Sequence, residues 1–174
     1  DVLQPQPIGE PPLDTSDGAV SLNRARISVD VEDFLAHATT ALEADRSREP
    51  NATARLKAAV AVHTGDFLED DPYQEWASML AEEVRAIYIA LLRTLSQRLR
   101  DAGDTDAVVQ YTLRLLERDR YDEDAHHSLV GVLIDAGRLG EARRHYRNYV
   151  RQMAEIDVQP SPLSEMTPRR LIAG

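Results

Sequence analysis

The residues of this 174-residue chain that could carry chemistry are few, and their spacing favours binding over catalysis. His126 and His127 stand beside Asp122, Glu123 and Asp124. Glu123 and His127 are four positions apart, so they share one face of a helix. A protein metal site needs at least three convergent ligands, and no third one is visible here. We therefore expect an acidic helix start, with no metal and no cofactor.

Nothing in the sequence marks an enzyme. The chain has no cysteine, no glycine-rich phosphate loop and no serine elbow. The acidic run Glu69-Asp70-Asp71 lacks the glycine and the spaced ligands of a calcium loop. A small enzyme or ligand sensor stays an alternative, because carboxylates can also be paired by the tertiary structure alone.

Charge is distributed unevenly along the chain. The net charge of −10 disfavours duplex binding by the whole surface, since phosphate contacts need a basic footprint. Residues 30–83 carry thirteen acids and four bases, whereas residues 137–174 carry seven bases and four acids. Arg143, Arg147 and Arg151 recur every four residues on a predicted helix. This stripe could meet an acidic protein or phosphates, although the solvated side of an amphipathic helix, partly offset by Glu141 and Glu155, is the commoner explanation.

These side chains must be positioned by helices, of which the longest is predicted over residues 71–102. Asp71-Pro72 is typical of a helix start, apolar residues then recur at spacings of three and four, and Gly103 suits a left-handed cap. Such a helix is about 45 Å long, so the helices before and after it should cover different parts of its length.

Five shorter helices are predicted around it. Asp30 caps the first, which breaks at residues 46–50, and Asn51 caps the second, which Gly65 closes. Asp104 caps the fourth, Asp122 starts the fifth, which ends at Gly137, and the sixth follows with apolar positions from Leu139 to Met153. A proline-rich lead-in precedes them, with a β-hairpin expected from Ala19 to Val29 around Asn23-Arg24.

Two of the helix junctions repeat. Ala102-Gly103 and Ala136-Gly137 lie 34 residues apart, and the second continues as Arg138-Leu139-Gly140-Glu141-Ala142. This resembles the middle of a tetratricopeptide repeat, a helix pair that stacks on its neighbours. The resemblance implies that the first helix of each pair lines a concave face, which could be a peptide groove with charged specificity. The residues placed there are Arg93, Gln97 and Arg100 from one pair and Asp124, His127 and Ile134 from the next.

Four segments extend the resemblance to a family. They are residues 29–34, residues 71–76, residues 116–126 and residues 136–146 with Glu141-Ala142-Arg143-Arg144-His145-Tyr146 at the end. In their order and spacing they resemble the bacterial transcriptional activator domain, a helical module of antibiotic-regulatory and related activators. The resemblance implies contacts between subunits, with other regulatory domains or with the transcription machinery, and a winged DNA-binding domain elsewhere.

We therefore predict an all-α, tetratricopeptide-like right-handed stack of helix pairs, preceded by a short extended or β-hairpin segment. We expect a lead-in over residues 1–29, a helical domain over residues 30–157 and a proline-containing tail over residues 158–174. The expected role is regulatory and non-enzymatic, in the cytoplasm and without a membrane segment. Its partner would be a protein, RNA polymerase among the candidates, or a second copy; DNA would be reached only through a domain not in this chain. A free-standing tetratricopeptide adaptor is the alternative.

Overall fold

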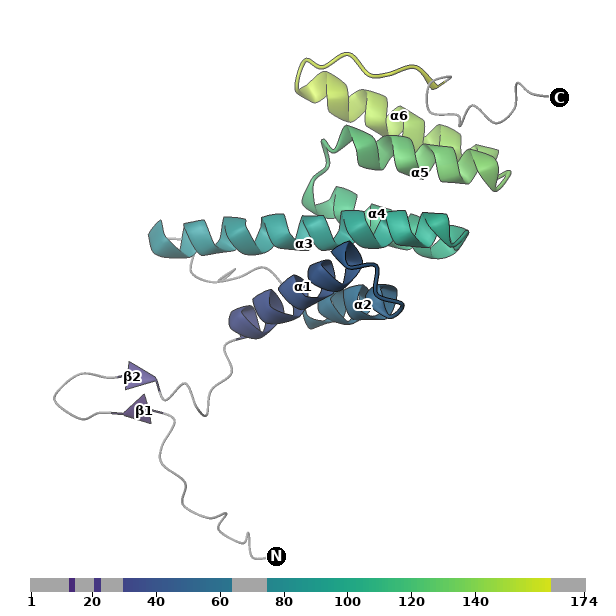
Figure 1. Cartoon of the computed structure of the whole chain (residues 1–174). Helices are drawn as coiled ribbons and strands as arrows, with labels where there is room; N and C mark the ends of the chain where they lie inside the picture. Colours follow the sequence, from purple (N-terminus) through teal and green to yellow (C-terminus); the bar gives the residue numbers. More distant parts are fainter. Residues whose placement is uncertain (1–12, 15–20, 23–29, 64–74, 164–174) are drawn as a thin grey trace, which may run out of the picture.

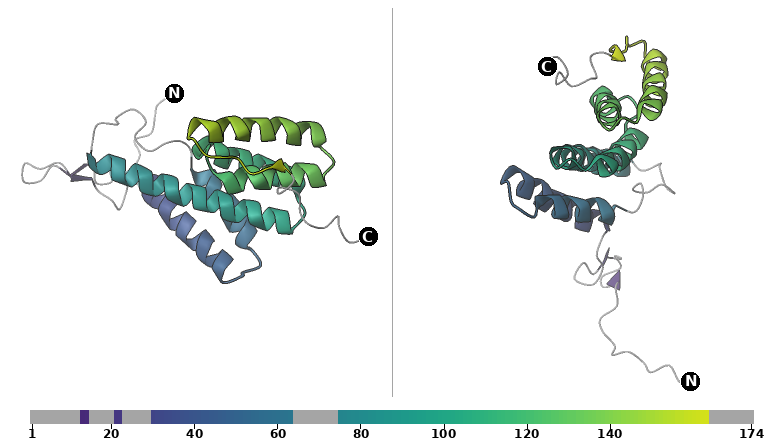
Figure 2. Two further views of the ribbon diagram at one scale, coloured as in Figure 1. Left: turned by 90° about the horizontal axis from the view of Figure 1, so that it is seen from above. Right: turned by 90° about the vertical axis from the view of Figure 1, so that its right-hand side faces the viewer.

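A computed structural model describes residues 13–14, 21–22, 30–63 and 75–163 of the chain. Its helices stack as antiparallel pairs along one direction (Figure 1). Figure 2 shows the same stack in two further views: from above, and from the side that lies on the right in Figure 1. The helices of the described residues are α1 (Asp30–Arg46), α2 (Ala52–Val62), α3 (Glu75–Asp101), α4 (Thr105–Arg118), α5 (Glu123–Asp135) and α6 (Leu139–Glu155). The predicted all-α, tetratricopeptide-like fold is confirmed.

The long helix α3 organises the stack. It packs against α1 and α2 as well as against α4, the other helix of its pair, and α4 in turn packs against α5. Its buried stripe of Leu91, Leu92, Leu95 and Leu99 forms the centre of the larger of two apolar clusters. A second cluster between α4, α5 and α6 is built around Leu129, Leu133, Tyr149 and Met153. Because different neighbours cover different parts of α3, its 27 residues can remain one helix.

Helix starts and stops follow local chemistry. The side chains of Asp104 and Asp122 accept hydrogen bonds from the backbone N–H groups of Ala107 and Ala125. Each carboxylate thereby satisfies an amide that the first helical turn leaves unpaired. Gly103 and Gly137 have φ values of +75° and +72°. This is the left-handed conformation in which many helices end, and glycine adopts it more easily than other residues. The predicted caps Asp104 and Asp122 and the predicted glycine stops Gly103 and Gly137 are confirmed. Asn51 holds the N-cap position of α2 as predicted, but its side chain makes no capping hydrogen bond within the described residues. The predicted helix start at Asp71-Pro72 lies outside the described residues.

The second helix ends earlier than predicted. Helix α2 stops at Val62, and His63 is extended with ψ of 101°, so Gly65, outside the described residues, is not its closing residue. The His63 ring stacks on Tyr88 at 4.0 Å between centroids and meets Phe34 edge-on at 5.2 Å. We attribute the early stop to this aromatic packing, since an interaction with α1 and α3 outweighs the weak preference for another helical turn.

The N-terminal strands also pair differently from the sequence prediction. Ser21–Leu22 (β2) runs antiparallel to the upstream Leu13–Asp14 (β1), with Leu13 opposite Leu22. The sequence alone predicts that β2 pairs with residues 26–29, which lie outside the described residues. Asp17-Gly18 is a stronger hairpin signal than Asn23-Arg24, because glycine accepts positive φ. Among the described helices, none combines the length and the apolar character needed to cross a membrane.

Candidate protein-binding groove

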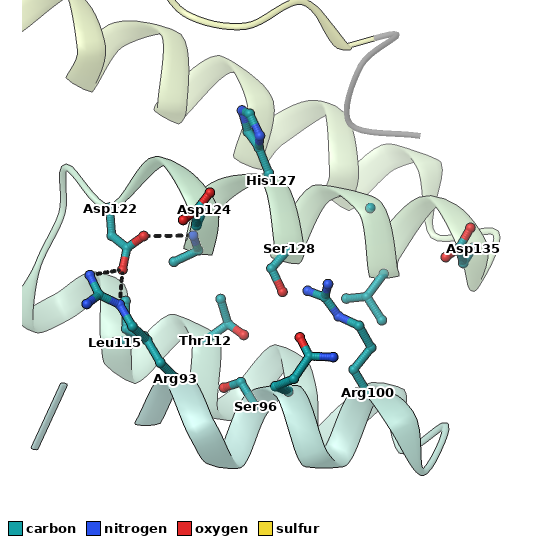
Figure 3. Close-up of a pocket in the computed structure, with 14 residues that line it drawn as sticks. Arg93, Ser96, Arg100, Thr112, Leu115, Asp122, Asp124, His127, Ser128 and Asp135 are labelled. Atoms are coloured by element: carbon teal, nitrogen blue, oxygen red, sulfur yellow. Dashed lines mark hydrogen bonds and ion pairs between the residues drawn. The ribbon is translucent and has the colours of Figure 1, made fainter. Parts of the chain in front are cut away.

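A cavity of about 730 Å³ opens between α3 and α5, over the side chains of α4 (Figure 3). Its walls include five of the six groove residues expected from the sequence: Arg93, Gln97, Arg100, Asp124 and His127. Ile134 does not line it and instead packs, partly buried, against the second apolar cluster. The predicted pairing of the helices therefore brings these five side chains to one cavity. Whether they bind a partner is a separate question.

Helical spacing explains why these side chains converge. Arg93, Gln97 and Arg100 lie three or four residues apart, so they form one ridge on α3. The opposite face of α3 carries the buried leucines, which turns this ridge away from the core and toward α5. Asp124, His127 and Ser128 line the cavity from α5. In Figure 3 the Ser128 side chain points toward the ridge, whereas the His127 ring points away from α3.

One wall residue is held by a partner across the cavity. Arg93 donates from Nε and Nη2 to Oδ2 of Asp122, at 2.9 and 2.7 Å. The Asp122 side chain is 4% exposed, and its other oxygen caps α5 at 2.9 Å from the Ala125 nitrogen. This one carboxylate therefore joins α3 to α5 and caps α5, so Arg93 is mainly structural. Sequence analysis identified the cap but missed the ion pair, which only the stacking brings together.

The cavity floor contains two hydroxyl groups without partners. Ser96 and Thr112 are 7% and 1% exposed, and neither hydroxyl makes a hydrogen bond within the described part of the chain. In Figure 3 both side chains lie between α3 and α5. A buried polar group without a partner costs about 1–3 kcal/mol, which a hydrogen-bonding ligand in the cavity would recover. The sequence analysis missed both, since a serine and a threonine on helices carry no signal of their own.

The other charges of the cavity remain available. Arg100, Asp124 and Asp135 are exposed, and within the described residues none of their side chains forms an ion pair or hydrogen bond. His127 contributes an imidazole whose Nε2 lies 3.5 Å from Oε1 of Glu123. The groove thus offers both signs of charge in addition to its hydroxyls, an arrangement suited to a polar chain rather than to an apolar small molecule.

A second hollow of about 770 Å³ continues from the first. It lies between the α1–α2 corner and α3, and Gln97 lines both hollows. Gln97 donates to Asp101 at 2.9 Å, and the Asp45–Arg98 ion pair lies in the wall of the second hollow. Gln97 therefore forms the ridge between two hollows that lie on successive helix pairs.

The basic stripe lies elsewhere. Arg143, Arg147 and Arg151 are all exposed on α6, and none of them lines the α3–α5 cavity. The flank of α6 around Tyr149 is covered by the C-terminal segment. There the Tyr149 hydroxyl donates to Glu123 and accepts from the Ser161 nitrogen at 2.8 Å. The hydrogen bond from Tyr149 holds the pKa of the Glu123 carboxyl below its ordinary value. Burial raises the pKa of Tyr149.

Comparison with known proteins agrees with this architecture. The family model described as the bacterial transcriptional activator domain matches residues 29–169. The chain belongs to this family. Comparisons with curated proteins and with solved structures returned no match. The bacterial transcriptional activator domain is a regulatory module rather than an enzyme family.

Proposed function

We propose that this bacterial transcriptional activator domain regulates transcription by holding a protein partner in the groove between α3 and α5. The observation that carries the proposal is the cavity itself. Among the residues that the structure describes, its walls carry charges of both signs without partners, and its floor carries two unsatisfied hydroxyls. These groups match the alternating donors and acceptors of a peptide segment. RNA polymerase, another regulatory domain or a second copy could supply that segment, and DNA would be bound by a separate domain.

The proposed test fills the groove without disturbing the core. Gln97 is exposed and lies on the ridge shared by the two hollows, so Gln97→Trp places an indole in the binding path. Gln110→Trp is the matched control, because Gln110 is an exposed glutamine of α4 that lines neither hollow. Each substitution is introduced into the native gene, and transcripts are compared with those of the wild type.

We expect Gln97→Trp to lower the transcripts of the regulated genes by about tenfold or more, because a blocked site loses the affinity of its main contacts. Gln110→Trp should leave them unchanged. Protein abundance and promoter occupancy are measured in both strains, so that a folding or DNA-binding defect is recognised. Normal activation by a stable Gln97→Trp protein would refute the groove as the regulatory contact.

A further inference from the structure

A second surface, independent of the groove, lies on α6. Leu139, Arg143, Arg147 and Arg151 are exposed, and they form a single row at intervals of four residues. Four residues of an α-helix advance about 6 Å, so the three guanidinium groups repeat along about 12 Å. Leu139, 57% exposed, places an apolar contact at the start of the row. We call these four residues the α6 row.

The acids of α6 do not neutralise this row. Glu141 is held by Arg138, which donates to both of its oxygens at 2.8 Å. Glu155 pairs with Arg120, which lies before α5. Both carboxylates that could offset the stripe are thus engaged by arginines outside the row. Within the described residues, Arg143 and Arg147 make no hydrogen bond or ion pair, and Arg151 donates only to Asn148, at 3.0 Å.

The row also stays open in the folded chain. The buried side of α6 is formed by Ala142, Tyr149 and Met153, and the C-terminal segment reaches Tyr146 and Tyr149 on that side. None of the hydrogen bonds of this segment involves the arginines of the row. A partner can therefore approach the α6 row without displacing any described part of the chain.

We propose that the α6 row docks an acidic helix of another protein, whose carboxylates repeat every four residues and whose apolar residue covers Leu139. Two helices side by side share the 6 Å repeat, so successive arginine–carboxylate pairs stay in register. A DNA strand suits the row less well. Its phosphates continue far beyond the 12 Å of the row, where they would be repelled by the rest of a chain whose net charge is −10.

The test uses two helical peptide probes of about 20 residues on an alanine background, long enough to form helix in water. The matched probe carries leucine followed by three glutamates at intervals of four; the scrambled probe has the same composition with the glutamates on different faces. Binding to the full chain is followed by fluorescence anisotropy at low and at physiological salt. The row variant, Arg143→Glu with Arg147→Glu and Arg151→Glu, is measured alongside a lysine version of the matched probe.

We expect the matched probe to bind about tenfold more tightly than the scrambled one, with affinity falling as salt rises, since each exposed pair contributes modestly and salt screens it. The row variant should lose this preference and bind the lysine probe instead, and circular dichroism shows whether it is folded. Equal binding of both glutamate probes, or no binding, would overturn the proposal. Tighter row-dependent binding to a DNA duplex would replace it with a nucleic-acid contact, and salt-sensitive self-association lost in the row variant would replace it with a second copy.

Discussion

Replacing Asp122 by alanine should destabilise the fold more than replacing any other single charged residue that lines the groove. The carboxylate has two roles that alanine removes together: it caps α5 and it accepts both donors of Arg93. Loss of an N-cap costs about 1 kcal/mol. Hydrogen bonds to a charged group contribute about 1.5–3 kcal/mol. The Arg93 side chain is 55% exposed and regains water, so we count only about 1–2 kcal/mol of this second contribution.

The expected loss is therefore about 2–3 kcal/mol, which lowers Tm by roughly 6–9 °C for a domain of this size. Urea and thermal unfolding followed by circular dichroism measure both quantities. Asp122→Asn should lower the free energy of unfolding by only about half as much, because asparagine also caps helices but does not carry the charge that pairs with Arg93. Asp124→Asn is the control; Asp124 is exposed and unpaired, so its change should stay within about 0.5 kcal/mol.

The reasoning would be refuted if Asp122→Ala changed the free energy of unfolding by less than about 0.5 kcal/mol. A double-mutant cycle with Arg93→Gln separates the two contributions. If the cap dominates, the cost of Asp122→Ala stays nearly the same in the Arg93→Gln background. If the ion pair dominates, most of that cost disappears there.

Three further changes test other parts of the structure. Gly137→Val should lower the free energy of unfolding in urea by about 1–2 kcal/mol; because φ is +72° and no atom lies within 4 Å of the new Cβ, this cost is backbone strain alone. Gly137→Asn should cost less, and equal stability of the wild type and both variants would contradict the left-handed cap. Partial burial, with Arg144 nearby, lowers the pKa of His145 from its ordinary 6.5. The unfolded chain therefore binds the proton more readily, and the stability that is present above about pH 6.5 should be lost as pH falls through the folded pKa. In urea titrations at a series of pH values, His145→Gln should flatten the slope of unfolding free energy against pH. An unchanged slope would exclude His145 as its source. Tyr149→Phe should cost about 1–3 kcal/mol and speed hydrogen exchange at the Ser161 amide, which loses its acceptor; unchanged exchange would show that the tail is held by other contacts.

Much of the helical framework could be predicted from local signals. Asp104 and Asp122 precede apolar stripes at the spacing of N-caps, so the starts of α4 and α5 were predicted closely. Gly103 follows α3 and Gly137 follows α5, so the ends of these two helices were predicted closely as well. The 34-residue spacing of the two glycines then placed α3 and α5 as neighbours. That step was enough to predict that Arg93, Gln97 and Arg100 line one groove together with Asp124 and His127.

The misses arose where contacts between distant segments decide the outcome. His63 leaves the helical path because it stacks on Tyr88 of α3, a residue 25 positions later in the chain. Glu141 and Glu155 were expected to offset the basic stripe, yet arginines outside it engage both. A sequence shows which charges lie on one helix, but it does not show which of them another helix will take.

The sequence by itself determined the six described helices, the caps of α4 and α5, the pairing of the helices and the family, because each depends on residues within one or two turns of each other or on a fixed repeat. Only the tertiary structure decided which polar groups are already satisfied. Arg93 pairs across the groove with Asp122, while in the described part of the chain the Arg100 side chain has no partner and the Ser96 and Thr112 hydroxyls are buried without one. The physical reason is that hydrogen bonding and burial depend on distances of a few ångströms between elements, which periodicity along one chain does not encode.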